Sequence, residues 1–169
     1  MNYTSAEAAK LLKKINEELD VLREREMKSA VFTAAVGEDI ESVRPKYDYA
    51  ETAEKLEALE AKVRYLKVRM HEFNLKTYIP ELGMTIDEAL VWIPQLSERK
   101  RKLTGMAARL PKERTQAAGY GSKTIIEYDY ANYDIEKAGA DLAAVTDLLA
   151  KAQGALDRVN STATLELDI

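Results

Sequence analysis

The sequence predicts an all-α protein, an antiparallel four-helix bundle of long helices made of two helical hairpins. Alanine and leucine are abundant, and only 7 glycines and 4 prolines interrupt its 169 residues, a composition that favours helices. Apolar residues recur every three or four positions along four long stretches, as on the buried face of an amphipathic helix. Capping motifs stand where three of these stretches begin.

The capping residues set the boundaries of the predicted helices. These helices span residues 5–28, 49–74, 86–110 and 134–160. Thr4 and Thr85 are each followed three positions later by a glutamate, the spacing of a capping box. Asp48 begins the second helix in the same way, and Asn132 or Asp134 caps the fourth.

The apolar seams explain why the helices should pack together. The fourth helix has the most regular seam, which consists of Ile135, Ala138, Leu142, Val145, Leu149, Ala152, Leu156 and Val159. A lone amphipathic helix is marginal in water, whereas each buried seam residue contributes roughly 1.5–3 kcal/mol. Four helices running up, down, up and down cover one another's seams, so residues 1–169 should form a single helical domain.

Three short segments, 30–36, 124–130 and 163–169, are β-prone. They should lie at opposite ends of a bundle, so their edges would stay unpaired within one chain. Unpaired strand edges and a seam period near 3.5 both favour association with a second copy. We therefore expect a homo-oligomer, a dimer or larger.

Two offsets suggest an internal duplication. The first predicted helix matches the third at an offset of 81 residues, with Thr4 on Thr85, and the second matches the fourth at an offset of 86, with Leu56 on Leu142. The alternative is that any two capped amphipathic helices can be aligned in this way. Under both interpretations the structural unit is a helical hairpin used twice.

The composition excludes several kinds of site. The chain has no cysteine and one histidine, which rules out disulfides, zinc–thiolate sites and iron–sulfur clusters. No stretch reaches the roughly 20 apolar residues of a membrane span, and the first residues lack the apolar core of a secretory signal. We expect a cytoplasmic protein with no membrane partner, no cofactor and no metal.

Charge is distributed unevenly along the chain. Residues 99–123 carry eight basic residues and one acidic residue, a net charge of +7, whereas the rest of the chain carries 17 basic and 28 acidic residues. Such a split predicts a partner-facing surface. The alternative is that this basic segment pairs with acidic helix faces within or between subunits. Nucleic acid is an unlikely partner because the sequence pI is near 5.3.

The basic segment and the tyrosines beside it form our candidate binding site. The candidate ligand-binding residues are Arg99, Lys102, Arg109, Lys123, Tyr120 and Tyr128. Arginine suits phosphate and carboxylate groups, and tyrosine offers a flat face with a hydroxyl. A small anionic ligand that carries phosphate, such as a nucleotide-like molecule, fits these side chains.

Catalytic candidates are few, and we expect no enzyme activity. His71 is a conceivable general base, but as a histidine near a helix end it has an ordinary structural explanation. Glu127 and Asp129 would share one face of a strand, where charged residues usually face water. Residues 119–124 lack the spacing of a nucleotide-binding phosphate loop.

Short motifs carry a family resemblance over most of residues 5–169. They are an Asn-x-x-Thr helix end at 74–77, a Thr-x-x-Glu-Ala-Leu helix start at 85–90, and a final helix with an Asn/Thr-rich tail at 160–164. In these motifs the chain resembles the bacterial and phage-associated helical proteins often labelled septicolysin-like or DIP-type, whose activity is not established. The family's Arg-Tyr-Ser-Arg-like entry to the β-prone segment is replaced here by residues 119–123. The resemblance implies a helical fold and little about function.

Together these observations support three hypotheses. The leading one is a non-enzymatic, homo-oligomeric binding protein that captures a small anionic ligand. The alternative is a scaffold that binds other proteins through its helix seams and strand edges. The third is a hydrolase that acts through carboxylates or His71.

Overall fold

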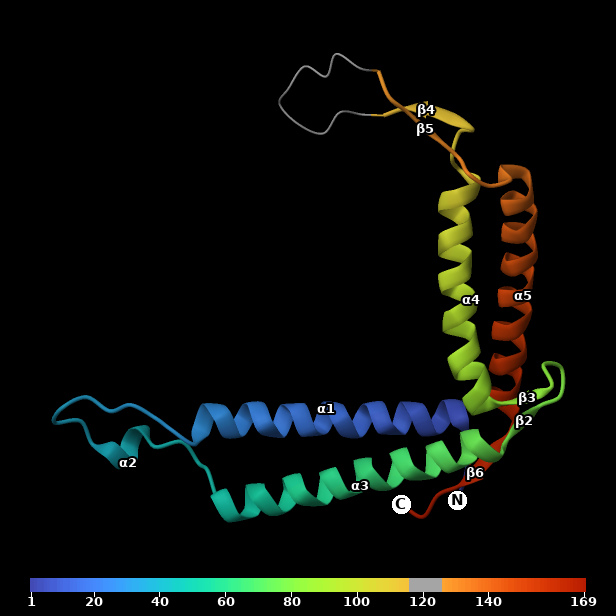
Figure 1. Ribbon diagram of the computed structural model, residues 1–169. Coiled ribbons are helices and arrows are strands. Elements are labelled where there is room, and N and C mark those ends of the chain that lie inside the picture. The colour runs from blue at the N-terminus through green and yellow to red at the C-terminus, as the bar shows by residue number, and fades with distance from the viewer. Residues whose placement is uncertain (116–125) are drawn as a thin grey trace. The chain divides into compact units, whose positions relative to one another are not determined.

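The computed structural model describes residues 1–115 and 126–169. The chain divides into two compact units, Met1–Thr77 with Arg158–Ile169, and Tyr78–Asp157. Each unit contains a pair of long helices and a two-stranded antiparallel ribbon beside the start of the first helix of the pair (Figure 1). The prediction of a mainly helical protein is confirmed. The four-helix bundle and the single domain stay predictions.

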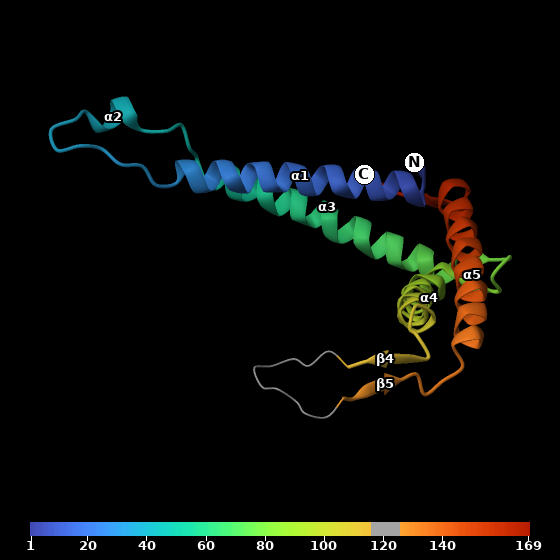
Figure 2. The same cartoon turned by 90° about the horizontal axis from the view of Figure 1, so that it is seen from above.

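The first unit is built on helices α1 (Ser5–Ser29) and α3 (Tyr49–Lys76). They lie side by side in both views (Figures 1 and 2), and the connection between them holds the short helix α2 (Ile40–Val43). Strand β1 (Asn2–Thr4) pairs with β6 (Thr164–Glu166). The buried core of this unit consists of Ala8, Ile15, Leu66, Leu165 and Leu167.

The second unit is built on helix α4 (Ile86–Ala107) and on helix α5 (Ile135–Thr162) up to Asp157. Before α4 lies the ribbon of β2 (Tyr78–Ile79) and β3 (Met84–Thr85). Between α4 and α5 lies the ribbon of β4 (Lys112–Arg114) and β5 (Tyr128–Tyr130). The core around the helix pair consists of Leu96, Val145, Leu149 and Ala152.

The capping residues act at the helix starts much as the sequence suggests. Thr4 forms a full capping box, in which its hydroxyl accepts from the Glu7 N–H at 3.2 Å and its own N–H donates to the Glu7 carboxylate at 2.8 Å. Thr85 repeats this arrangement at the start of α4. Asp48 caps α3, but the side chain of Glu51 pairs with a lysine in the next turn and does not return to Asp48.

Three expectations about local structure are wrong. Residues 30–36 form no strand, and Val31 in this segment is 81% exposed, so no apolar face there is buried as a strand requires. Helix α4 ends at Ala107 rather than at residue 110, and Lys112 then enters a strand. The β-prone segments that contain β5 and β6 are not left unpaired within the chain, because β5 pairs with β4 and β6 pairs with β1.

The strand pairs support the interpretation of an internal duplication. An offset of 81 places β1 on β3, and an offset of 86 places β2 on β6. The register pairs Tyr78 with Thr85 and Ile79 with Met84. Applying both offsets converts these two pairs into Thr164 with Thr4 and Leu165 with Tyr3, which is the register observed in the other ribbon. Two capped helices aligned by chance would not also reproduce the register of the strands beside them.

The equivalent strands are exchanged between the two halves of the chain. β2 follows α3 along the chain but pairs in the second unit, and β6 follows α5 but pairs in the first. The N-terminal ammonium of Met1 donates to the Leu167 carbonyl at 2.9 Å, so the two ends of the chain meet in one ribbon. The corresponding place in the other ribbon is the turn at residues 80–83, where Gly83 has a positive φ of 69° that favours glycine.

Candidate functional site

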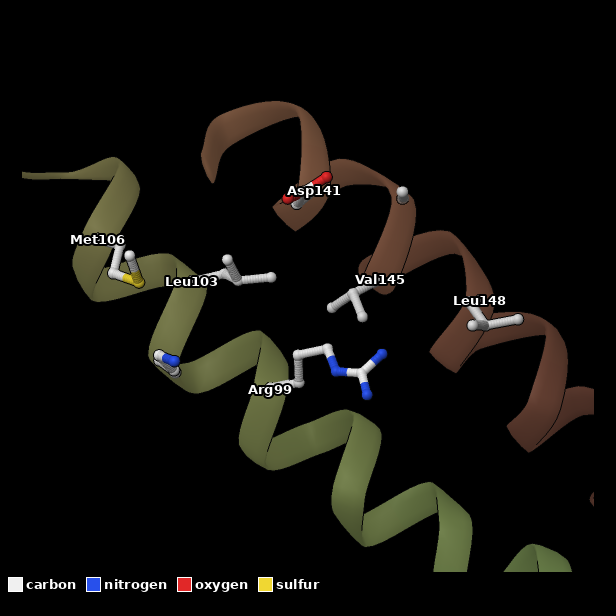
Figure 3. A pocket seen from close by; sticks show the side chains of 8 residues that line it. Arg99, Leu103, Met106, Asp141, Val145 and Leu148 are labelled. Carbon is white, nitrogen blue, oxygen red and sulfur yellow. The ribbon is translucent and has the colours of Figure 1, made fainter. Parts of the chain in front are cut away.

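The candidate binding site is a groove of about 550 Å³ between α4 and α5, inside the second unit (Figure 3). Helix α4 contributes Arg99, Lys102, Leu103 and Met106. Helix α5 contributes Asp141, Ala144, Val145 and Leu148. Figure 3 shows the Arg99 side chain extending from α4 toward Val145 and Leu148 on α5.

Helical spacing brings these side chains together. Residues three and four positions apart share a helix face, so the residues at 99, 102, 103 and 106 form one strip of α4. On α5 the residues at 141, 144, 145 and 148 form the facing strip. Val145 is 5% exposed and belongs to the core, whereas Leu148 is 38% exposed at the groove. The groove therefore has an apolar floor that two helices alone leave open to solvent.

The groove also has a basic edge. Within the described part of the chain, neither Arg99 nor Lys102 takes part in an ion pair. By contrast, Arg101 donates to the Glu98 carboxylate at 2.7 Å, and this bond raises its pKa. Asp141 forms an ion pair with Lys137, at 3.1 Å, one turn earlier on α5. The two cations at the groove are thus available to an anion from outside.

The same observation bears on the alternative interpretation, in which the basic segment pairs with acidic helix faces. Across residues 99–115, as far as the structure describes their ion pairs, the only one is that of Arg101 with Glu98 on the same helix. No ion pair joins this part of the segment to α5. Pairing with another subunit stays a prediction.

The predicted tyrosine face lies elsewhere in the unit. The Lys112 ammonium stands 4.1 Å from the ring centroid of Tyr128 and 5.4 Å from that of Tyr130, so a cation of the β4–β5 ribbon already covers these rings. Tyr133 donates its hydroxyl to the Met106 carbonyl at 2.9 Å and ties the end of α4 to the segment that precedes α5.

The structure brings together two of the six candidate ligand-binding residues, Arg99 and Lys102. Arg109 is exposed beyond the end of α4 and is not among the groove residues. Tyr120 and Lys123 lie outside the described residues. Asp141 and Leu148 were not predicted as site residues. Their position beside the apolar seam of the predicted helix 134–160 is the sequence signal that could have identified them.

The catalytic candidates are divided between the two units. His71 is exposed on α3 in the first unit. Glu127 and Asp129 are exposed at the β5 strand of the second unit. Among the described residues, no three histidine, aspartate or glutamate side chains are placed to hold a metal ion. In that same part of the chain, no helix is apolar and long enough to span a membrane.

Comparison with known proteins gives one informative match. The sequence matches no family model and no curated protein. The structure is similar to the crystal structure of a functionally unknown conserved protein from Corynebacterium diphtheriae, with a TM-score of 0.68 and 18% sequence identity. The match covers 98% of this chain and 100% of that chain. It establishes a shared fold, and the resemblance to septicolysin-like and phage-associated proteins stays a prediction.

Proposed function

We propose that this chain is a non-enzymatic binding protein that holds a small amphipathic anion in the α4–α5 groove. The observation that carries the proposal is the position of Arg99 and Lys102, two cations without an ion pair among the described residues, at the edge of an apolar groove. A volume of about 550 Å³ lies in the range of small-molecule sites.

The two cations suit a single anionic group. Residues three positions apart on a helix have Cβ atoms roughly 5–6 Å apart, so one phosphate or carboxylate can contact both side chains. The planar guanidinium of Arg99 can donate two parallel hydrogen bonds, and the Lys102 ammonium adds a point charge.

The floor of the groove suits an aliphatic body rather than a nucleobase. Leu103, Met106, Ala144 and Leu148 line it, and the lining has no aromatic ring as far as the structure describes the chain. The sequence suggests a nucleotide-like ligand, but the aliphatic lining favours an aliphatic phosphate or carboxylate instead. Among the described residues the lining contains no serine, threonine or histidine, and its one carboxylate, that of Asp141, is paired with Lys137; this composition favours binding over catalysis.

Calorimetric titration with octyl phosphate tests the proposal. We expect binding to the wild-type chain, and an affinity about tenfold lower in Arg99→Ala and in Lys102→Ala, since a hydrogen bond to a charged group contributes roughly 1.5–3 kcal/mol. Arg101→Ala is the matched control, because Arg101 is on the same helix but pairs with Glu98. Ala144→Trp, which fills the groove and leaves both cations in place, should abolish binding.

Parallel titrations identify the ligand class. Octanoate distinguishes a carboxylate from a phosphate, adenosine monophosphate tests the nucleotide-like ligand, and octanol tests the aliphatic body alone. Octanol binding as tightly as octyl phosphate, or Arg99→Ala binding as tightly as the wild type, would refute the proposal. Arg109→Ala tests the remaining described arginine of the sequence-based site, and we expect no loss of affinity from it.

A protein-binding scaffold is the second candidate function. A specific observation favours it, which is a second apolar groove on the first unit with a valine, Val21, 58% exposed at its centre.

A further inference from the structure

The second groove lies between α1 and α3 and has a volume of about 400 Å³. Val21 and Leu22 of α1 and Leu59 of α3 provide its apolar surface. Val21 is 58% exposed although it stands well inside a helix of 25 residues. Since a pair of helices covers only the seam between them, the outer side of this seam is left without cover.

This groove is the counterpart of the α4–α5 groove in the other half of the chain. The two offsets of the internal duplication relate five residues of one groove to five residues of the other. In order, they relate Glu18, Val21, Leu22, Arg25 and Leu59 to Arg99, Lys102, Leu103, Met106 and Val145. The charges differ: Glu18 and Val21 stand where the other groove has its two cations. The α1–α3 groove therefore lacks the pair of cations that the proposed function assigns to the other groove.

Four charged residues line the α1–α3 groove, Lys14, Glu17, Glu18 and Arg25. The two that flank its apolar residues most closely along α1 have opposite charges. Glu18 lies three residues before Val21, and Arg25 lies three residues after Leu22. Neither forms an ion pair among the described residues. The ion pairs of the charged neighbours are Lys13 with Glu17 at 3.7 Å, Arg23 with Glu60 at 2.7 Å and Lys28 with Glu24 at 2.5 Å.

We propose that this groove is the interface of a symmetric homodimer, in which α1 of a second copy lies antiparallel across it. A twofold axis between Val21 and Leu22 places each Val21 level with Leu22 of the partner subunit. The same axis places Glu18 level with Arg25 of the partner subunit, and this pair occurs twice. At 1.5 Å per residue the two ion pairs lie about 10 Å apart along the helix axis, on either side of the apolar centre.

Charge complementarity selects a second copy as the occupant and fixes its direction. A twofold interface must be self-complementary, because the same patch is used by both subunits. The order acid, apolar pair, base along α1 meets this requirement when the two helices are antiparallel. A parallel arrangement would place Glu18 against Glu18 and Arg25 against Arg25, and like charges set face to face are destabilising.

Charge reversal tests both the interface and its direction. Sedimentation velocity of the full chain at about 1–100 µM should detect a dimer that dissociates on dilution. Glu18→Arg and Arg25→Glu should each raise the dimer dissociation constant about tenfold or more, since each creates two like-charge contacts. The double variant Glu18→Arg/Arg25→Glu exchanges the charges and should restore the wild-type constant.

Asp20→Arg is the matched control, because it makes the same charge change at an exposed position of α1 that does not line the groove. Circular dichroism of every variant should give the wild-type helical signal. A wild-type chain that stays monomeric, single reversals that behave like the control, or a double variant that does not recover would each overturn the proposal. The Arg99→Ala variant should dimerise normally, so this inference and the proposed function can fail separately.

Discussion

Replacing Leu167 with alanine tests whether the carboxyl-terminal segment is part of the core of the first unit. Leu167 is 1% exposed and lies in the cluster with Leu66 and Ile15. The substitution removes three buried carbons, at about 0.8 kcal/mol each. It also leaves a cavity, so we expect a loss of about 2.5–4 kcal/mol, inside the range of roughly 2–5 kcal/mol for leucine-to-alanine changes in cores.

Urea unfolding followed by circular dichroism measures this loss. The unfolding midpoint should fall while the slope with urea concentration stays the same, and the melting temperature should fall by about 5–15 °C for a chain of this size. Ile169→Ala is the control, because Ile169 is two residues further along and 45% exposed. If Leu167→Ala loses no more stability than Ile169→Ala, the segment is not packed as described and the reasoning from burial fails.

Three further predictions concern helix ends and pH. Thr4→Ala removes the hydroxyl that caps α1 and should cost about 1 kcal/mol in urea unfolding, with Thr4→Ser close to the wild type; equal losses in both variants would contradict the capping role. The hydrogen bond from the Thr4 backbone N–H is the main cause, and that from its hydroxyl the second, of a pKa of Glu7 below its ordinary value. The stabilisation from Glu7 should therefore be complete above the unfolded-state pKa and disappear as the pH falls through the folded-state pKa; Glu7→Gln should reduce the slope of stability against pH on the acid side of the unfolded-state pKa, and an unchanged slope there would exclude this linkage. Tyr133→Phe removes the hydroxyl that donates to the Met106 carbonyl at 2.9 Å and should lower the free energy of unfolding by about 0.5–1.5 kcal/mol. Thermal unfolding measures this loss; a melting temperature equal to that of the wild type would mean that a bond to water replaces this hydrogen bond at no cost in stability.

The helices could be predicted from the sequence because their signals are local. The capping box of Thr4 with Glu7 lies within one turn, and an apolar seam repeats many times along a helix of 25 or 28 residues. Strands β5 and β6 lie within two of the segments predicted to be β-prone. Strands β2 and β3 were not predicted, because each has two residues, too few to reveal a period. β1 also pairs with β6, a partner about 160 positions away that nothing near Tyr3 indicates.

The candidate site could be predicted only in part, for a similar reason. The charge of the basic segment is a property of the sequence, and it directed attention to Arg99 and Lys102. Which of its cations meets an apolar surface depends on which residues of α5 face α4, and Leu148 enters the site from 46 positions further along than Lys102. Tyr128 is a suitable ligand-binding residue by its side-chain chemistry, but the β4–β5 ribbon places Lys112 over its ring.

The exchange of strands between the two halves places the first and last strands of the chain side by side in one ribbon. Met1 meets Leu167 in one ribbon, and the turn at 80–83 occupies the equivalent place in the other. A circular permutant that joins the present ends and opens at Gly83 should keep every helix, strand and register. Two separate fragments cut at the same glycine would each lack the strand that completes their own ribbon, so restoring both observed ribbons would require the two fragments to bind each other.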